Sequence, residues 1–207
     1  MPTTPPTSRV RRTRSWRRAL SAAGAVTLAV GVAAGSSADA ADSSAPPVAT
    51  AAAVACANTS LVPSAHDTAE ISGAILCLVN AAREQHGLAP LIPIRALNQS
   101  AMGHSRDMVA HDYFGHTTPS GHTPAQRMLH DGAPCADGCA VGENIAWASG
   151  SDSTPAAIVQ AWMNSAGHRA NILEPGFRYE GLGVAEGSPA MLSQGQSGTT
   201  VTQDFDS

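Results

Sequence analysis

Three residues that are able to bind a metal ion or transfer a proton each stand directly after a glycine. They are His116 in "YFGHTTPSGH", Glu143 in "VGENIAW" and His168 in "SAGHRAN". Glycine lets the backbone turn tightly and present the next side chain at a surface. Imidazole and carboxylate groups bind divalent ions and act as acids or bases. These positions are therefore the first candidates for chemistry.

Each of the three also has an ordinary structural interpretation. A loop histidine such as His116 is often held by hydrogen bonds, and Glu143 is able to accept bonds from backbone N–H groups. His168 follows an apolar helical stretch that breaks at Gly167, so it suits a helix-end cap, where the helix dipole favours a positive charge. The three positions are 27 and 25 residues apart, and this spacing alone does not bring them together.

A second cluster competes with these candidates. His104, Asp107 and His111 fall at i, i+3 and i+7, on one face of an expected helix, and that geometry also suits a metal ion. The sequence contains no HExxH, GxSxG or Cys–His motif that would assign a reaction. On the residues alone, both hypotheses remain open.

The first 66 residues have the composition of targeting and linker segments. Six arginines precede residue 19, an Ala- and Val-rich run follows over residues 19–35, and Ala38 and Ala40 frame a small-x-small site. This order predicts a secretory signal peptide over residues 1–40. Residues 41–66 are rich in Ala, Ser and Pro, which predicts a disordered linker. The domain is then expected over residues 67–207.

The charge after residue 40 excludes one class of partner. Six arginines and fifteen acids remain, and the chain has no lysine, so the formal charge of this part is −9 with neutral histidines. Binding to nucleic acid depends on neutralising phosphates. We therefore expect no nucleic-acid partner, and no membrane span once the signal peptide is removed.

The four cysteines predict two disulfides. An exported chain meets an oxidising environment, where an even number of cysteines favours disulfides over thiols. Of the three possible pairings we favour Cys56–Cys77, which would tie the tail to the first helix, and Cys135–Cys139, which would close a short loop. A metal site is the alternative, but the C-x3-C spacing has no second close pair.

The remaining pattern predicts an α+β domain with helices first and strands last. The first helix is expected from Asp67, in a capping box with Glu70, to Gly87. The second carries the His104 stripe, and Thr123-Pro124 and Thr154-Pro155 are expected to open two more. Alternation predicts strands in "RYEGLGVAEG" and "TTVTQDF", with a third short strand in "AMLS", residues 190–193.

Several segments taken together resemble one family. "GHSRDMVAHDYFGHTTPSGHTPAQRM", "GENIAWASG", "AWMNSAGHRANIL" and "GLGVA", in this order, are similar to the CAP superfamily over about residues 67–206. The superfamily includes cysteine-rich secretory, antigen 5 and pathogenesis-related proteins, and the likeness is to its bacterial SCP-like extracellular branch. The resemblance implies an α-β-α sandwich, with a three-stranded antiparallel sheet between helical layers.

The resemblance also implies a cleft lined by two histidines and two acids. Residue by residue, it assigns His116, Glu143 and His168 to that cleft. Many eukaryotic members have the second acid three residues after the helix tryptophan, but here Trp162 is followed at that spacing by Ser165. Two imidazoles and a carboxylate suit Zn²⁺ or another divalent cation, bound by His116 and His168, with Glu143 as third ligand or as partner of the bound water.

Three functions remain as hypotheses. The first is a secreted, extracellular binding module with a metal in its cleft and a surface for a lipid or cell-envelope partner. The second is a metal-assisted hydrolase that acts on peptides or envelope polymers. The third is a structural envelope protein whose histidines bind nothing. Whether the protein is an enzyme is left open, because a fold does not fix a function.

Overall fold

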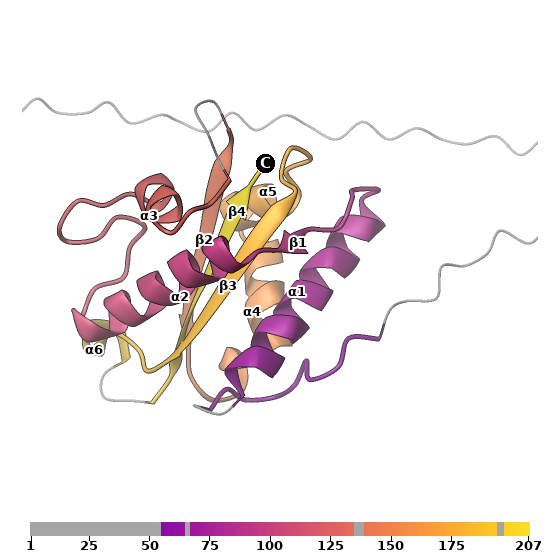
Figure 1. Cartoon of the computed structure of the whole chain (residues 1–207). Coiled ribbons are helices and arrows are strands. Elements are labelled where there is room, and N and C mark those ends of the chain that lie inside the picture. The colour runs from indigo at the N-terminus through magenta and orange to yellow at the C-terminus, as the bar shows by residue number, and fades with distance from the viewer. Residues whose placement is uncertain (1–54, 65–66, 135–138, 194–196) are drawn as a thin grey trace, which may run out of the picture. The chain divides into compact units, whose positions relative to one another are not determined.

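The computed structural model describes residues 55–64, 67–134, 139–193 and 197–207, which are coloured in Figure 1. The expected signal peptide over residues 1–40 lies outside the described residues, and so does the expected linker as far as residue 54.

The described residues alternate between helices and strands. The helices are α1 (Thr68–Gln85), α2 (Arg95–Ala110), α3 (Pro124–His130), the 3₁₀ turn η1 (Gly150–Ser153), α4 (Pro155–Asn164), α5 (Ala166–Ile172) and α6 (Ala190–Ser193). The strands are β1 (Ile92–Pro93), β2 (Val141–Ala148), β3 (Tyr179–Glu186) and β4 (Thr199–Asp206).

Three long strands form an antiparallel sheet. In the order β1-β3-β4-β2, strand β4 lies between β3 and β2 and pairs antiparallel with both. Strand β1 adds a two-residue parallel pairing beside the start of β3. The expected α+β class is confirmed, and the short β1 makes the sheet four-stranded instead of three-stranded.

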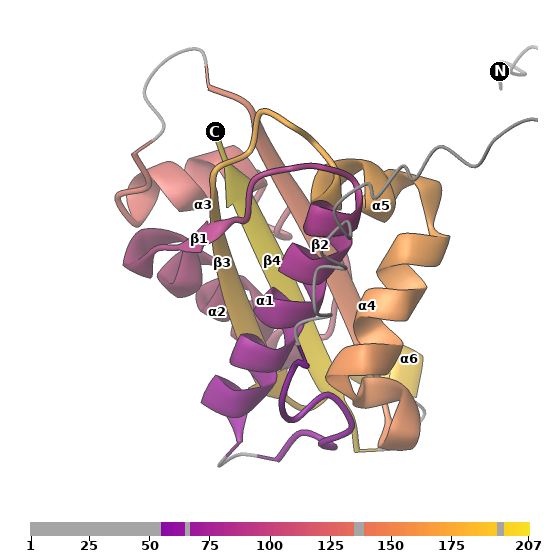
Figure 2. The ribbon, with the colours of Figure 1, turned by 90° about the vertical axis from the view of Figure 1, so that its right-hand side faces the viewer.

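Helices cover both faces of the sheet, as the two ribbon views show (Figures 1 and 2). Helices α2 and α3 lie on one face, and α1, α4 and α5 lie on the other. Helix α2 lies very close to β3, because a Cβ atom at Gly181 or Gly183 would overlap the backbone of α2 at Leu97 or Ala101. Alternate glycines of β3 therefore allow this close packing.

The main apolar core lies on the opposite face, against α1 and α4. Its buried members include Ile71, Ile75 and Val79 from α1, Ile158, Val159 and Trp162 from α4, and Leu182, Val184, Val201 and Phe205 from the sheet. The Trp162 indole N–H donates to the carbonyl oxygen of Ile145 at 3.4 Å. One large aromatic side chain thus joins α4 to β2.

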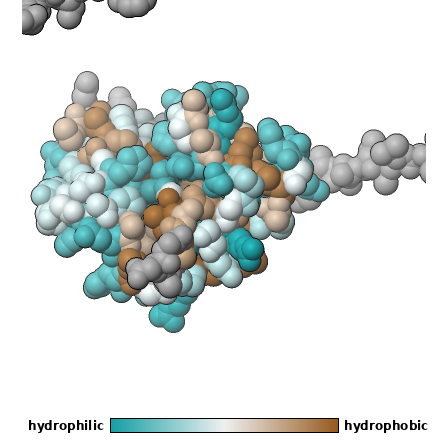
Figure 3. Space-filling model, turned by 90° about the horizontal axis from the view of Figure 1, so that it is seen from above, coloured by the Kyte–Doolittle hydropathy of each residue, from teal (hydrophilic) through white to brown (hydrophobic). Residues whose placement is uncertain are grey.

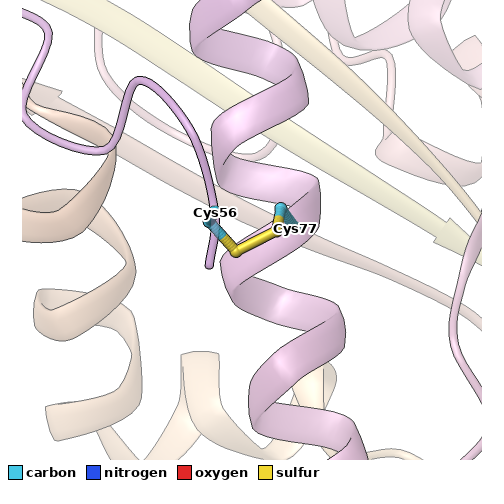
Figure 4. Close-up of a disulfide and its surroundings, with 2 residues drawn as sticks. All are labelled: Cys56 and Cys77. Carbon is cyan, nitrogen blue, oxygen red and sulfur yellow. A yellow bond between two sulfur atoms is a disulfide. The ribbon is translucent and has the colours of Figure 1, made fainter. Parts of the chain in front are cut away.

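The predicted Cys56–Cys77 disulfide is confirmed (Figure 4). It ties residues 55–64 to α1, the Thr59 carbonyl oxygen accepts from the Ala156 N–H at 2.9 Å, and Leu61 packs against the core. We expected these ten residues to belong to a disordered linker. Instead they are held against the domain, because the disulfide and one apolar contact fix their course.

The second predicted disulfide stays a prediction. Cys135 lies outside the described residues, and Cys139 carries a free, partly exposed thiol. Both cysteines flank the segment just before β2. A bond between them would close the loop that leads to Glu143.

The helix before His168 ends two residues earlier than the sequence indicated. Helix α4 stops at Asn164, and Ser165 adopts an extended conformation with φ −94° and ψ 123° before α5 begins. His168 therefore lies inside α5 and is not a helix-end cap. The extended Ser165, and not Gly167, makes the break.

Local capping signals were correct at two of three expected helix starts. Thr123 forms a capping box with Gln126, and the Thr154 side chain accepts from the Ala157 N–H. Asp67 stands at the start of α1 without a side-chain cap, because its carboxylate accepts from the Ser64 hydroxyl at 2.5 Å.

The expected short strand "AMLS" is wrong, since these residues form the helical turn α6. The N–H groups of Leu192 and Ser193 both donate to the carbonyl oxygen of Pro189. A proline fixes its own φ and favours such a turn. A search of the described helices finds none with the length and apolar character that a membrane span requires.

Candidate functional site

His116 lies in the loop between α2 and α3, with 53% of its side chain exposed. The capped start of α3 holds the end of this loop. From α3, Arg127 donates through Nη1 to the carbonyl oxygens of His116 and His122, at 2.9 and 3.1 Å. One guanidinium thus fixes both ends of residues 116–122 and so positions the His116 backbone.

Glu143 lies on β2 with only 1% of its side chain exposed. Its Oε1 accepts from His116 Nδ1 at 2.8 Å, and its Oε2 accepts from Arg127 Nη2. A buried carboxylate requires such partners, and bonds between charged groups are the stronger kind. Both oxygens of Glu143 therefore already accept from protein donors.

The bond to Glu143 determines how His116 is presented. An ionised carboxylate only accepts hydrogen bonds, so the imidazole proton lies on Nδ1 and Nε2 faces away from Glu143. The hydrogen bond to Glu143 raises the pKa of His116 above its ordinary value, although partial burial opposes the rise. A carboxylate that orients a histidine in this way is a common arrangement behind metal ligands.

His168 lies on α5, and its side chain is close enough to His116 for the two imidazoles to interact electrostatically. Its Nδ1 is buried and has no hydrogen-bond partner among the described residues. Burial lowers the pKa of His168, and the charge of neighbouring His116 lowers it further. His168 therefore favours the neutral imidazole, which is the form that ligates a metal.

His104 belongs to the surroundings of Glu143, which the sequence did not indicate. Its side chain is fully buried, its Nε2 donates to the carbonyl oxygen of Gly115 at 3.0 Å, and the same nitrogen is 3.9 Å from Glu143 Oε2. Burial lowers the pKa of His104. A neutral His104 thus supports the loop that precedes His116.

The competing cluster of His104, Asp107 and His111 does not assemble. His104 points inward, whereas the exposed His111 pairs with Asp107 at the surface, with Nδ1 2.8 Å from Oδ1. Asp107 also accepts from the hydroxyl of Tyr113 at 2.5 Å. The helical spacing was correct, but buried and exposed surroundings separate the two histidines.

A second buried acid lies opposite Glu143 on the neighbouring strand. Asp204 of β4 is paired with Glu143 in register and is completely buried. Burial raises the pKa of Asp204 well above its ordinary range, and the charge of Glu143 raises it further. Ser100 is another polar neighbour, although neither carboxyl oxygen has a hydrogen bond of ordinary geometry among the described residues. Asp204 therefore favours its neutral, protonated form beside the Glu143 carboxyl group.

Two cavities border these residues. One, of about 380 Å³, is lined by His116, Glu143, Asn171 and residues at the starts of α3 and β2. The other, of about 450 Å³, lies between α2 and α3 and is lined by residues that include His104 and Arg127. The described residues contain no group of three His, Cys, Asp or Glu side chains arranged to hold a metal.

The structure therefore brings His116 and Glu143 into direct contact and places His168 within electrostatic reach of His116. It adds Arg127 and Asp204, which sequence reasoning did not select, and His104, which the sequence had indicated only as part of the competing cluster. Arg127 stands in "PAQRM", within a segment that carries the family resemblance, but its spacing from Glu143 gives no local signal. Asp204 adds a second acid beside Glu143, on β4, whereas Ser165, at the position of the family's second acid, lies in the extended break between α4 and α5.

Comparisons with known proteins identify the family of the chain. Residues 76–205 match the model of the CAP family, described as the cysteine-rich secretory protein family. YkwD of Bacillus subtilis is 39% identical over 128 residues, which are 62% of this chain and 44% of YkwD. The chain thus spans under half the length of that relative.

Solved structures show the same fold. An extracellular protein containing an SCP domain from Bacillus anthracis matches with a TM-score of 0.56 and 30% identity, over 69% of this chain and 44% of that one. An outer surface protein of Borrelia burgdorferi matches with a TM-score of 0.51 and 17% identity, over 64% of this chain and 88% of that one. With the family model covering more than half of its residues, the chain belongs to the CAP family.

Proposed function

We propose that the chain is an exported CAP-domain protein whose cleft binds Zn²⁺ or a similar divalent ion through His116 and His168. The observation that carries this proposal is the bond between His116 Nδ1 and Glu143 Oε1, which leaves Nε2 of His116 as the free nitrogen. A neutral His168 with an unpartnered buried Nδ1 supports it. Imidazole nitrogens of this kind are preferred zinc ligands.

Glu143 is proposed first as the partner that positions His116. Its Oε1 accepts from His116 and its Oε2 from Arg127, and each oxygen keeps a second lone pair for a metal or a bound water. Glu143 fits a positioning partner, because it fixes the proton and the ring orientation of His116. A bound divalent ion would supply a Lewis acid at this point of the cleft.

A cell-envelope or lipid partner remains the proposed use of the protein surface. A structural relative from Bacillus anthracis is an extracellular protein, and the Cys56–Cys77 disulfide fits an oxidising environment outside the cytoplasm. On the face seen in Figure 3, hydrophilic and hydrophobic residues are interleaved. That face therefore favours a mixed polar partner over a purely apolar one.

The alternative is a metal-assisted hydrolase acting on peptides or envelope polymers. Its support is the register pair of Asp204 and Glu143, in which burial favours the protonated form of Asp204, since paired carboxyl groups in different environments suit acid and base roles. However, Asp204 is fully buried, and both oxygens of Glu143 already accept from protein donors. Binding without turnover therefore has the stronger support.

A zinc titration tests the metal site. The protein is purified without a chelator or a histidine tag and titrated by calorimetry near neutral pH, together with His116→Ala, His168→Ala and His111→Ala. We expect zinc binding by the wild type and a loss of affinity of roughly tenfold or more in the first two variants. The exposed His111 is the matched control and should leave the affinity unchanged. A wild type that binds no zinc, or a loss seen only in His111→Ala, would contradict the proposal.

A further inference from the structure

A row of buried polar side chains crosses the sheet beneath α5. Asn144 on β2 and Gln203 on β4 are paired in register, and both are completely buried. Glu180 on β3 continues the row with 1% of the residue exposed. Polar groups buried to this degree are nearly always hydrogen-bonded, so their partners indicate what the row holds in place.

The end of the row nearest the cleft is attached to α5 and to Glu143. Asn144 Nδ2 donates to the carbonyl oxygen of His168 at 3.3 Å and to Gln203 Oε1 at 3.4 Å. The Asn171 Nδ2 donates to Asn144 Oδ1 at 2.9 Å and to the carbonyl oxygen of Glu143 at 3.0 Å. One asparagine side chain thus joins the backbone of His168 to the strand that carries Glu143.

The far end of the row sets the direction of these bonds. Gln203 Nε2 donates to Glu180 Oε2 at 2.6 Å. Gln203 thus turns its NH₂ group toward Glu180 and its oxygen toward Asn144. Above its pKa of about 7 the Glu180 carboxylate is ionised and only accepts, which holds Gln203 in this direction. Arg83 adds a positive charge near Glu180, while its own N–H groups donate to the carbonyl oxygens of Ala89, Ile172, Glu174 and Phe177.

We propose that Gln203 is a positioning residue for the cleft, which it touches only through Asn144. By accepting from Asn144 it keeps that side chain in the one orientation that holds both His168 and Asn171. Any effect of Gln203 on metal binding rests on the proposed function, but its effect on the position of α5 does not.

The physical reason is that each side-chain amide in the row has to turn its NH₂ group toward the oxygen of the next side chain. If Gln203 turned over, its NH₂ group would face the NH₂ group of Asn144. Asn144 would then have to turn as well, and it would lose its bonds to His168 and Asn171. Gln203 on β4 thereby controls the backbone position of His168 on α5, although the two residues are far apart in the sequence.

Two matched variants separate this role from simple packing. Gln203→Met keeps the approximate volume but removes the acceptor for Asn144. The exchange Glu180→Gln with Gln203→Glu keeps an acceptor toward Asn144 and restores a bond between positions 180 and 203. Hydrogen–deuterium exchange of α5 is measured by mass spectrometry at a pH of about 8, above the Glu180 pKa of about 7, without metal. The C-terminal half of α2 is the internal control.

We expect α5 to exchange roughly fivefold faster or more in Gln203→Met, with α2 unchanged, and the exchanged pair to return α5 to the wild-type rate. Wild-type exchange of α5 in Gln203→Met, or equally fast exchange in both variants, would overturn the inference. If Gln203→Met does not fold, Glu180→Gln alone, which removes the acceptor-only group that sets the direction of Gln203, is compared with the exchanged pair in the same way. Failure of the wild type to bind zinc would count against the proposed function alone, because these exchange rates are measured without metal.

Discussion

Replacing Glu180 by glutamine should change how the stability of the domain depends on pH. Burial raises the pKa of Glu180 from 4.5 to about 7, although Gln203 and Arg83 both oppose the rise. Between these two values the folded protein holds a proton that the unfolded chain has released. Stability contributed by this group is therefore fully present below pH 4.5 and is lost as the pH rises through about 7.

The size of the effect follows from the change in pKa. A rise from 4.5 to about 7 corresponds to about 3 kcal/mol of unfolding free energy, lost by the wild type between acidic and neutral pH. Glutamine has nearly the same shape and does not ionise. Relative to the wild type, Glu180→Gln should therefore gain about 3 kcal/mol on going from a pH of about 4.5 to about 8.5.

The assay is urea unfolding of both proteins at several pH values, with the disulfide intact. The difference between the two unfolding free energies is the useful quantity, because the raised pKa of Asp204 affects both proteins equally and cancels. If the two curves of stability against pH run parallel, within about 0.5 kcal/mol, Glu180 is not a buried titrating group and the reasoning is refuted.

Two further predictions concern the fold. Gly181→Ala should destabilise the domain by about 3 kcal/mol or more, because the new Cβ would overlap the backbone of Leu97. Its control, Gly73→Ala, adds a Cβ in open space on α1 and should be neutral or slightly stabilising. Thermal unfolding compares the two variants, and equal melting temperatures would contradict the close packing of α2 against β3. Replacing both Cys56 and Cys77 by serine should cost about 3 kcal/mol, because the bond closes a loop with a sequence separation of 21. Denaturant unfolding measures this cost, and an unchanged midpoint would show that residues 55–64 contribute nothing to stability.

Helix starts were predictable because their signals are local. Thr123 and Thr154 each cap a helix within three residues of themselves, so their sequence neighbours contain the whole interaction. The predicted cap at Asp67 was wrong for an equally local reason, since the Ser64 hydroxyl donates to its carboxylate instead. Strand β2 was not predicted, because Glu143 and Asn144 are both buried in it and interrupt the alternation of apolar residues.

The candidate site was only partly predictable, for a different reason. The family resemblance assigned His116, Glu143 and His168, but the partners of Glu143 come from separate elements. Arg127 and Asp204 reach it from α3 and β4, and no sequence spacing encodes those approaches. The protonation of Asp204 depends on its burial, and that burial follows from the packing of α2 against the sheet and not from local sequence.

The most direct test of the central claim is the protonation of the two cleft histidines on addition of zinc. Long-range ¹H–¹⁵N NMR distinguishes a nitrogen that carries a proton from one that binds a metal. The account predicts that zinc shifts Nε2 of His116 and one ring nitrogen of His168, while Nδ1 of His116 keeps its proton and its bond to Glu143. A proton lost from Nδ1 of His116, or zinc-dependent shifts confined to the exposed His111, would contradict it.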